Sequence, residues 1–234
     1  MADDTTDDLG AFLVWFKSQT EAAWARHRTT PIEEFKEAGA GGRSWRSGTE
    51  WQPGLAADEI DAIEERWDVR FPPPYRTFLS ILNAPDRGMY SVGWADDESE
   101  ELVEVEDEPS FYDWQRDSEE LTCALKDPLD GLLFDVEHND LWPKSWGTKP
   151  QASQVPARLA ELVAAAPALI PVYGHRYLLD HKVGDDYPVL SVQQADIIFY
   201  GSNLRNYLLL DLDGLIGPTP GVTFEAANSA ILKD

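Results

Sequence analysis

The sequence predicts an α+β fold in which a mostly antiparallel sheet is flanked by helices and preceded by an N-terminal helical arm. Residues 9–27 and 58–82 carry apolar side chains at helical spacing. Residues 89–201 contain short runs of β-branched and aromatic residues joined by short links, which is typical of antiparallel strands. With 234 residues, 43% hydrophobic content and nine Trp, the chain can build a core without disulfides or metals.

The first predicted helix runs from Leu9 to about His27. Asp7 or Asp8 stands where a carboxylate can cap the first free N–H groups. One face is expected to pack on the rest of the protein, and it consists of Leu9, Phe12, Leu13, Phe16, Ala23 and Trp24. The glycine-rich stretch 39–48 has no GK[ST] ending, so we expect a flexible connection there and no phosphate-binding loop.

A helical hairpin is predicted next. Asp58 can cap a helix that places Ile60, Ile63 and Trp67 on one face. Prolines 72–74 stop this helix, and one of them can open a second. The apolar residues of that second helix fall at i, i+3, i+4 and i+7, at Tyr75, Phe78, Leu79 and Leu82.

The periodicity changes at Met89, and a sheet is predicted to begin there. Residues 89–96 and 101–107 predict two strands of a hairpin, and residues 131–139 a further strand. Residues 155–167 predict a helix with Leu159, Leu162 and Val163 on its buried side. The remaining predicted elements are strands at 169–174, 176–180, 188–192 and 196–201 and a closing helix at 203–212.

The charge is strongly negative, with 43 acidic and 19 basic residues and a formal net charge of −24. Such a field repels nucleic acid and anionic lipid, so neither is an expected partner, and a membrane partner is not expected. It favours a basic protein, although the same charge also serves solubility. Much of the excess lies in residues 96–108, where such a run forms a solvated loop, a sheet edge or an interaction surface.

A lone Cys123, the absence of a signal peptide and the absence of an apolar run of about 20 residues predict a soluble, cytoplasmic protein. We expect Cys123 itself to be a small buried hydrophobic residue rather than a nucleophile. Ser191 and Ser202 lack the GxSxG setting of a serine hydrolase.

Several strings resemble the SUKH superfamily, which includes the yeast cell-wall assembly regulator and bacterial immunity proteins. They are EIDAIEERWDVRFPPPYRTFLSILN (59–83), FDVEHNDLW (134–142), LIPVYGHRYL (169–178) and PVLSVQQADIIFYGSNLRNYL (188–208). The resemblance covers roughly residues 58–212. It predicts a helical arm and linker at 1–54, a SUKH-like α+β domain at 55–213 and a C-terminal tail at 214–234.

The resemblance implies a binding module with no enzymatic activity and no cofactor. Many bacterial members look like cytoplasmic antidotes to polymorphic toxins. We therefore predict an immunity protein that binds and neutralises a cognate toxin, and the acidic charge favours a basic, nuclease-type one. A regulatory scaffold that binds an endogenous protein is the alternative.

A metal-dependent enzyme is the third hypothesis. Asp135, Glu137 and His138 lie within four residues, and His175 and His181 could add imidazole ligands for zinc or iron. On a strand, Asp135 and Glu137 would share one face and His138 would take the other, so no metal site is expected. An enzyme would be built on Asp135, His138 and His175. His175 and its neighbour Arg176 are expected to hold a turn.

The predicted partner-binding residues combine acidic side chains with aromatic ones, because aromatic residues dominate binding hot spots. We expect the aromatic members to be exposed. The set is Trp94, Asp96, Asp97, Glu98, Glu101, Glu104, Glu106, Tyr112, Trp114 and Trp142.

Overall fold

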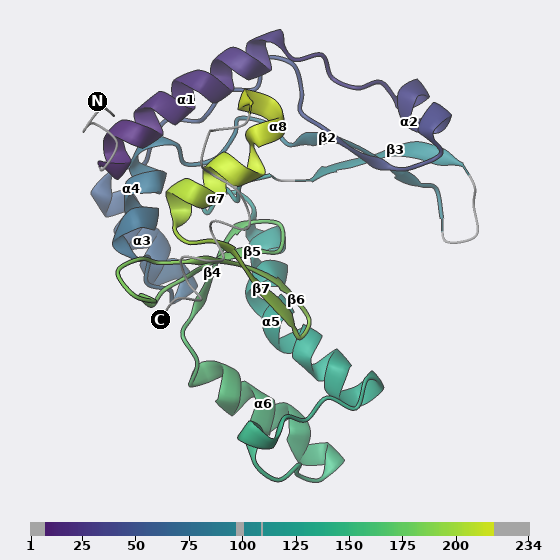
Figure 1. Cartoon of the computed structure of the whole chain (residues 1–234), viewed down its shortest axis with the longest axis vertical. Helices are drawn as coiled ribbons and strands as arrows, with labels where there is room; N and C mark the ends of the chain where they lie inside the picture. The colour runs from purple at the N-terminus through teal and green to yellow at the C-terminus, as the bar shows by residue number, and fades with distance from the viewer. Residues whose placement is uncertain (1–7, 97–100, 109, 218–234) are drawn as a thin grey trace.

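The computed structural model describes residues 8–96, 101–108 and 110–217, and it confirms the α+β fold (Figure 1). The helices are α1 (Leu9–Arg26), α2 (Ile32–Ala38), α3 (Ala57–Trp67), α4 (Pro73–Ile81), α5 (Ser118–His138), α6 (Val155–Ala164), α7 (Leu204–Asp211) and α8 (Asp213–Ile216). The strands are β1 (Gly42–Ser44), β2 (Met89–Trp94), β3 (Leu102–Glu108), β4 (Leu169–Tyr173), β5 (Arg176–Leu179), β6 (Val189–Gln193) and β7 (Asp196–Gly201).

The described strands form two antiparallel sheets, where one sheet was expected. One has the order β1-β2-β3 and the other the order β4-β5-β6-β7. The two helices α5 and α6 occupy the chain between them. β3 and β4 are therefore not sequence neighbours joined by a short turn, and each sheet pairs only within its own run of strands.

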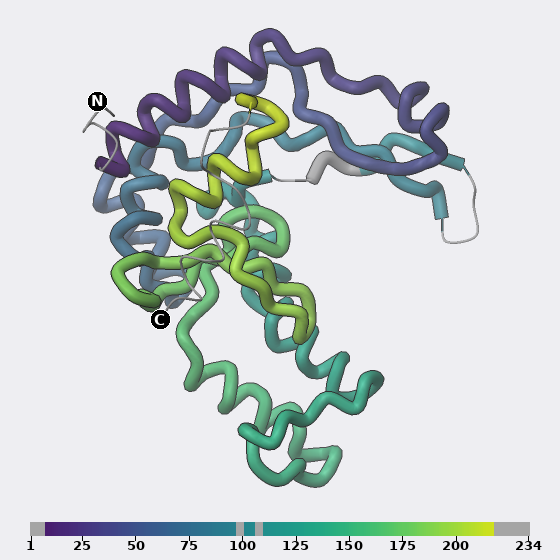
Figure 2. Tube along the Cα trace, in the orientation of Figure 1, coloured from purple at the N-terminus to yellow at the C-terminus, as the bar shows by residue number. Residues whose placement is uncertain are grey.

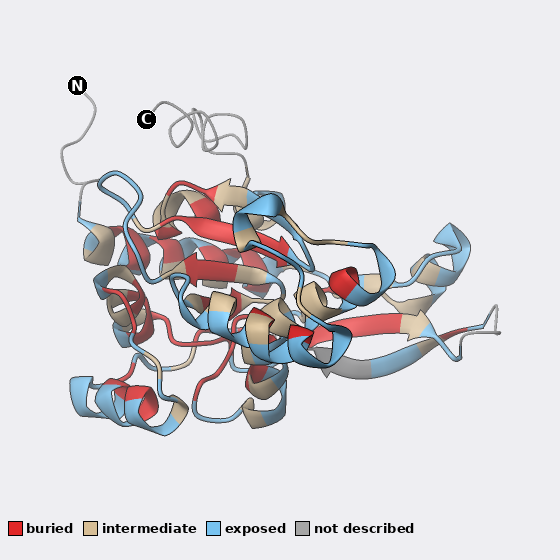
Figure 3. Ribbon diagram, turned by 90° about the horizontal axis from the view of Figure 1, so that it is seen from below, coloured by how far each residue is buried: buried red, intermediate tan, exposed pale blue. Residues whose placement is uncertain are grey.

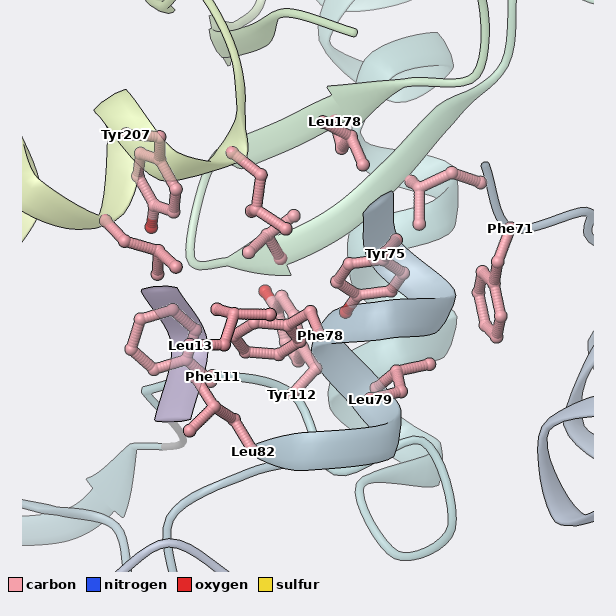
Figure 4. Packing of buried hydrophobic residues seen from close by; sticks show 14 of the residues in the cluster. Leu13, Phe71, Tyr75, Phe78, Leu79, Leu82, Phe111, Tyr112, Leu178 and Tyr207 are labelled. Atoms are coloured by element: carbon pink, nitrogen blue, oxygen red, sulfur yellow. The ribbon is translucent and has the colours of Figure 1, made fainter. Parts of the chain in front are cut away.

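The main core lies in the body of the molecule, between the helices α1, α3, α4 and α7 and the sheet β4–β7 (Figure 4). It is dense in aromatic side chains, among which Tyr75 and Phe78 stack with their ring centroids 5.5 Å apart. Figure 3 shows that buried residues concentrate in the body. Large rigid rings bury much apolar area at little entropic cost, so this core stabilises the fold.

The N-terminal helix α1 is part of this core, as its predicted apolar face required. Asp8 accepts a hydrogen bond from the backbone N–H of Gly10 at 2.9 Å, which confirms its capping role. Trp51 donates from its indole N–H to the hydroxyl of Thr20 at 2.8 Å and packs edge-on against Phe78. The helix also lies beside α8, so the first and last helices of the described chain pack together (Figure 2).

The helical hairpin of α3 and α4 is confirmed, with one correction at its start. The N-cap of α3 is Ala56, two residues before the predicted cap Asp58. The carboxylate of Glu59 accepts from the backbone N–H of Ala56 at 2.8 Å, which leaves Asp58 within the first turn. Glu64 is buried and accepts from the backbone N–H of Phe71 and from Arg76, which fixes the hairpin.

An arm projects from the body, and the sequence predicted only half of it. We call α2 with β1, β2 and β3 the acidic arm (Figure 1). The hairpin of β2 and β3 was predicted, but residues 42–44 form β1, where a flexible connection was expected. The helix α2 was missed, although Pro31 before it and Gly39 in the left-handed conformation after it are ordinary boundary signals.

The largest correction concerns residues 131–139, which form the C-terminal end of the helix α5 and its cap Asn139 rather than a strand. Pro128 and Gly131 inside this helix break the helical pattern in the sequence. Gly131 has a packing reason: a Cβ atom there would lie 2.8 Å from the Cα of Gln194 in the turn between β6 and β7. Glycine therefore allows α5 to pack closely against the second sheet.

The other predicted strands and helices are confirmed. They are β4 to β7 and the helices α6 and α7, within a residue or two at most ends. The C-terminal half of α5 packs with α6 to form a separate lobe below the body (Figure 1). This lobe has a small core of its own around Val136, Val155 and Leu159.

Candidate partner-binding surface

The acidic arm is held together by a small core of its own. Tyr90, Val92 and Leu102 of the sheet are buried against Ile32 and Phe35 of α2. This core is separate from the main one, so the acidic arm is a distinct substructure that projects from the body. A surface of this kind can contact a partner without disturbing the fold.

Trp94 lies at the outer end of this arm, and 49% of its surface is exposed. Leu102 is its partner in the register of β2 and β3. Trp94 lines a shallow pocket with Lys36, Gly39 and Glu101. A large indole that is half exposed beside a pocket is typical of a binding hot spot, because contact with a partner removes much apolar surface from water.

The hairpin around Trp94 is acidic throughout. Residues 89–108 contain nine acidic residues and no Lys or Arg. Glu104 accepts from the hydroxyl of Tyr90 at 2.8 Å, and burial together with this carboxylate raises the pKa of Tyr90 to about 12. Glu101 and Glu104 are both exposed. The arm therefore presents negative charge around an apolar anchor, which suits a basic protein surface.

The other acidic members of the predicted set fall at or near the edge of the described chain. Asp96 is exposed and follows Trp94. Asp97 and Glu98 lie outside the described residues. Glu106 belongs to β3, although its side chain is outside the described part.

Tyr112 and Trp114 are corrections, because both are buried and were expected to be exposed. Trp114 has no exposed surface, and its indole N–H donates to the hydroxyl of Tyr75 at 2.9 Å. Tyr112 is 7% exposed and donates to the carbonyl of Gly174. Their acidic sequence neighbours suggested a surface loop, but the segment runs alongside β4, where Phe111 bridges to Tyr173. Neither side chain can contact a partner in this fold.

Trp142 is half-buried and belongs to the lobe. Its indole N–H donates to the carbonyl of Gly147 at 2.9 Å, and its ring meets that of Trp146 edge-on. Both rings pack against the small core of the lobe. The structure thus assigns Trp142 to a different cluster from Trp94, and the predicted aromatic set does not form one surface.

The residues of the enzyme hypothesis do not converge. Within the described ranges, no group of three or more His, Cys, Asp or Glu side chains could hold a metal ion. Asp135 is buried and accepts from the backbone N–H of Ala195 at 2.8 Å and from Asn139, whereas Glu137 and His138 are exposed. His181 is exposed as well. The strand argument against this site was wrong in its geometry, since Asp135, Glu137 and His138 lie on a helix.

His175 and Arg176 lie at the turn between β4 and β5. Arg176 donates to the hydroxyl of Ser191 at 2.8 Å and stacks over the ring of Tyr200, so it joins neighbouring strands. Desolvation, together with Arg176 and Arg43, lowers the pKa of His175. Cys123 is exposed, which corrects the expectation that it would be buried.

We expect Asp135→Ala to lower the free energy of unfolding by about 1–3 kcal/mol, because it leaves the partly buried N–H of Ala195 without its acceptor. Glu137→Ala on the same helix is the matched control and should change stability by less than about 0.5 kcal/mol. Chemical denaturation of both variants measures this difference. Equal effects would contradict the structural role of Asp135.

The comparison with known families assigns the fold. The model of the SMI1 / KNR4 family (SUKH-1) matches residues 54–229, which is well over half of the chain. The chain belongs to the SMI1/KNR4 (SUKH-1) family. The match covers both sheets of this SUKH-1 protein except β1, while α1, α2 and β1 precede it. No curated protein and no solved structure matches the chain.

No helix in the part of the SUKH-1 chain that the structure describes could span a membrane. None of these helices combines the length and apolar character that crossing a bilayer requires.

Proposed function

We propose that this SUKH-1 protein is a non-catalytic, cytoplasmic immunity protein that binds and neutralises a basic toxin through its acidic arm. The observation that carries the proposal is the half-exposed Trp94 on a projecting hairpin whose charged residues are all acidic. The family supports it, because SUKH-1 members include immunity proteins.

The arm would act in two stages. Its negative field raises the rate at which a basic protein encounters it, by an amount that falls with ionic strength. Trp94 then supplies the short-range contact, since its indole can be buried in the interface. Occupying a basic active-site or substrate-binding surface would block access of an anionic substrate such as nucleic acid.

Capture from the source cells tests this function. The tagged protein is recovered at low salt, the bound proteins are identified, and each is expressed alone and together with the SUKH-1 protein. We expect a basic partner that is toxic when expressed alone, is neutralised by co-expression and binds less at high salt. A housekeeping partner with no toxicity would favour the regulatory scaffold and overturn the immunity proposal.

A further inference from the structure

A polar pocket of about 200 Å³ lies where the acidic arm joins the body. Residues 85–88 lead into β2 and form one wall, and residues 110–117 lead out of β3 and form the other. Gln52 and Glu120 complete the lining. The pocket therefore belongs to the root of the arm that we propose as the partner-binding surface.

Four carboxylates line this pocket, and two already hold arginines of the same chain. Asp86 accepts from Arg87, with Nε 3.0 Å from its Oδ2. Asp113 lies 3.7 Å from Arg116 and also accepts from the amide of Gln52 at 2.9 Å. The chemistry of the pocket thus already accommodates guanidinium groups.

The other two carboxylates, Asp117 and Glu120, form no ion pair with any described residue. One oxygen of Asp117 accepts from the backbone N–H of Asp113 at 2.7 Å. Desolvation, with the nearby Asp113 and Glu120 carboxylates, raises the pKa of Asp117 to about 6, although the N–H of Asp113 and the charge of Arg116 act in the opposite direction. The pocket therefore carries more negative charge than its own arginines balance.

Ser110 supplies an independent observation. The residue lines the same pocket and is only 2% exposed, and its hydroxyl oxygen is buried with no hydrogen-bond partner among the described residues. Buried hydroxyls are normally hydrogen-bonded, because leaving one unpaired costs stability. A ligand that donates hydrogen bonds would satisfy it.

We propose that this pocket receives a basic side chain, arginine or lysine, of the partner protein. Asp117 and Glu120 balance its charge, and the hydroxyl of Ser110 accepts one of its N–H groups. The inference rests on the proposed function, which supplies a partner with a basic surface. An arm anchored at Trp94 and a pocket at its root would together fix the orientation of that partner.

Short peptides test the pocket without the partner. The probes are acetyl-Gly-Arg-Gly-amide and acetyl-Gly-Lys-Gly-amide, with acetyl-Gly-Gly-Gly-amide as control, titrated into the ¹⁵N-labelled full chain at pH 7.5 and low salt. We expect saturable shifts of the backbone amides of residues 110–120 with the basic peptides only. The tighter basic peptide identifies the preferred side chain. Affinity should fall at least tenfold in Asp117→Asn and in Ser110→Ala.

Asp117→Asn also separates a binding role from a structural one. Asparagine can still accept from the N–H of Asp113, and the side chain at 117 makes no cap hydrogen bond to the described α5 that the substitution could break. The pKa of Asp117 is raised, so ionisation costs stability above about pH 6, and this cost vanishes as the pH falls toward the ordinary value of 3.8. The variant should therefore melt at a higher temperature than wild type at pH 7.5 and at the same temperature at pH 3.5.

Other charged and titratable groups lie around Asp117, and the pH comparison uses the variant to isolate its contribution. They are Asp113 and Arg116 of the preceding turn, Glu120 of α5, Asp86 and Arg87 of the opposite wall, and Tyr112. If Asp117→Asn is more stable yet binds the peptides less tightly, the carboxylate of Asp117 serves binding at the expense of stability.

Any of three results would contradict the proposal that this pocket binds a basic side chain. They are linear shifts without saturation, equal shifts with the triglycine peptide, and unchanged affinity in both variants. The outcome is separable from that of the proposed function. Failure of the peptides to bind while a basic toxin is still captured removes the pocket alone. Peptide binding by a protein that captures no toxin removes the immunity function and leaves the pocket.

Discussion

Trp114→Ala is expected to lower the free energy of unfolding by about 3–5 kcal/mol, the range for deleting a fully buried aromatic side chain. The ring centroid of Trp114 lies 4.7 Å from that of Phe71, 6.2 Å from that of Trp67 and 6.4 Å from that of Tyr75. The substitution also removes the N–H that donates to Tyr75. A cavity and a broken buried hydrogen bond then add to the lost apolar burial. Chemical denaturation followed by circular dichroism measures the loss.

Trp94→Ala is the matched control for the same residue type in the opposite environment. Since half of its surface is exposed, we expect a loss of only about 1 kcal/mol in stability, well below that of Trp114→Ala. Its effect should instead fall on binding of the captured partner, with a loss of about 2 kcal/mol or roughly 30-fold in affinity. A large stability loss in Trp94→Ala with unchanged binding would contradict the assignment of Trp94 to the partner surface.

The second large effect is expected from reversing the charge of the acidic arm. Changing Glu101, Glu104 and Glu106 together to Lys should slow association with the captured basic partner by about 10- to 100-fold at low salt. The reason is that three negative charges near the interface become positive and repel the partner as it approaches. Stopped-flow association at about 20 mM and 150 mM salt measures the rate, and the difference should shrink at the higher salt.

A triple variant elsewhere carries the same change of net charge. Glu65 of α3, Glu137 of α5 and Glu161 of α6 are exposed and lie outside the arm. At about 150 mM salt, changing these three to Lys should slow association by no more than about threefold, because charges are screened over roughly 8 Å there. If both variants slow association equally, the arm has no special place in the interface. If neither does and the arm variant aggregates, its charges serve to protect the open edge of β3.

The local patterns of the sequence were sufficient to predict most of the helices and strands of the body. The apolar face of α1, the helices α3 and α4 around their prolines, and the strands β4 to β7 all follow from the spacing of residues within one segment. These elements could be predicted because a periodicity of 3.6 or 2 residues is a property of the segment itself. The acidic character of the β2–β3 hairpin was visible in the same way.

The helix α5 and the division into two sheets could not be predicted in this manner. Pro128 and Gly131 weaken the helical pattern of α5, and Gly131 is explained only by the turn at Gln194 that lies against it. The strand β1 has three residues, and its pairing with β2 joins segments almost fifty residues apart. Non-local contacts of this kind override weak local preference.

The residues of the candidate site also fall into those that the sequence identified and those that only the tertiary structure brought together. From the sequence alone come the family, the negative charge and the choice of Trp94 with Glu101 and Glu104. Only the tertiary structure separates Trp94 at the end of the arm from Trp114 in the core, and only it brings Ser110 and Asp117 to one pocket with residues 85–88. The physical reason is that composition and spacing belong to a segment, whereas burial and shared charge depend on which distant segments lie against it.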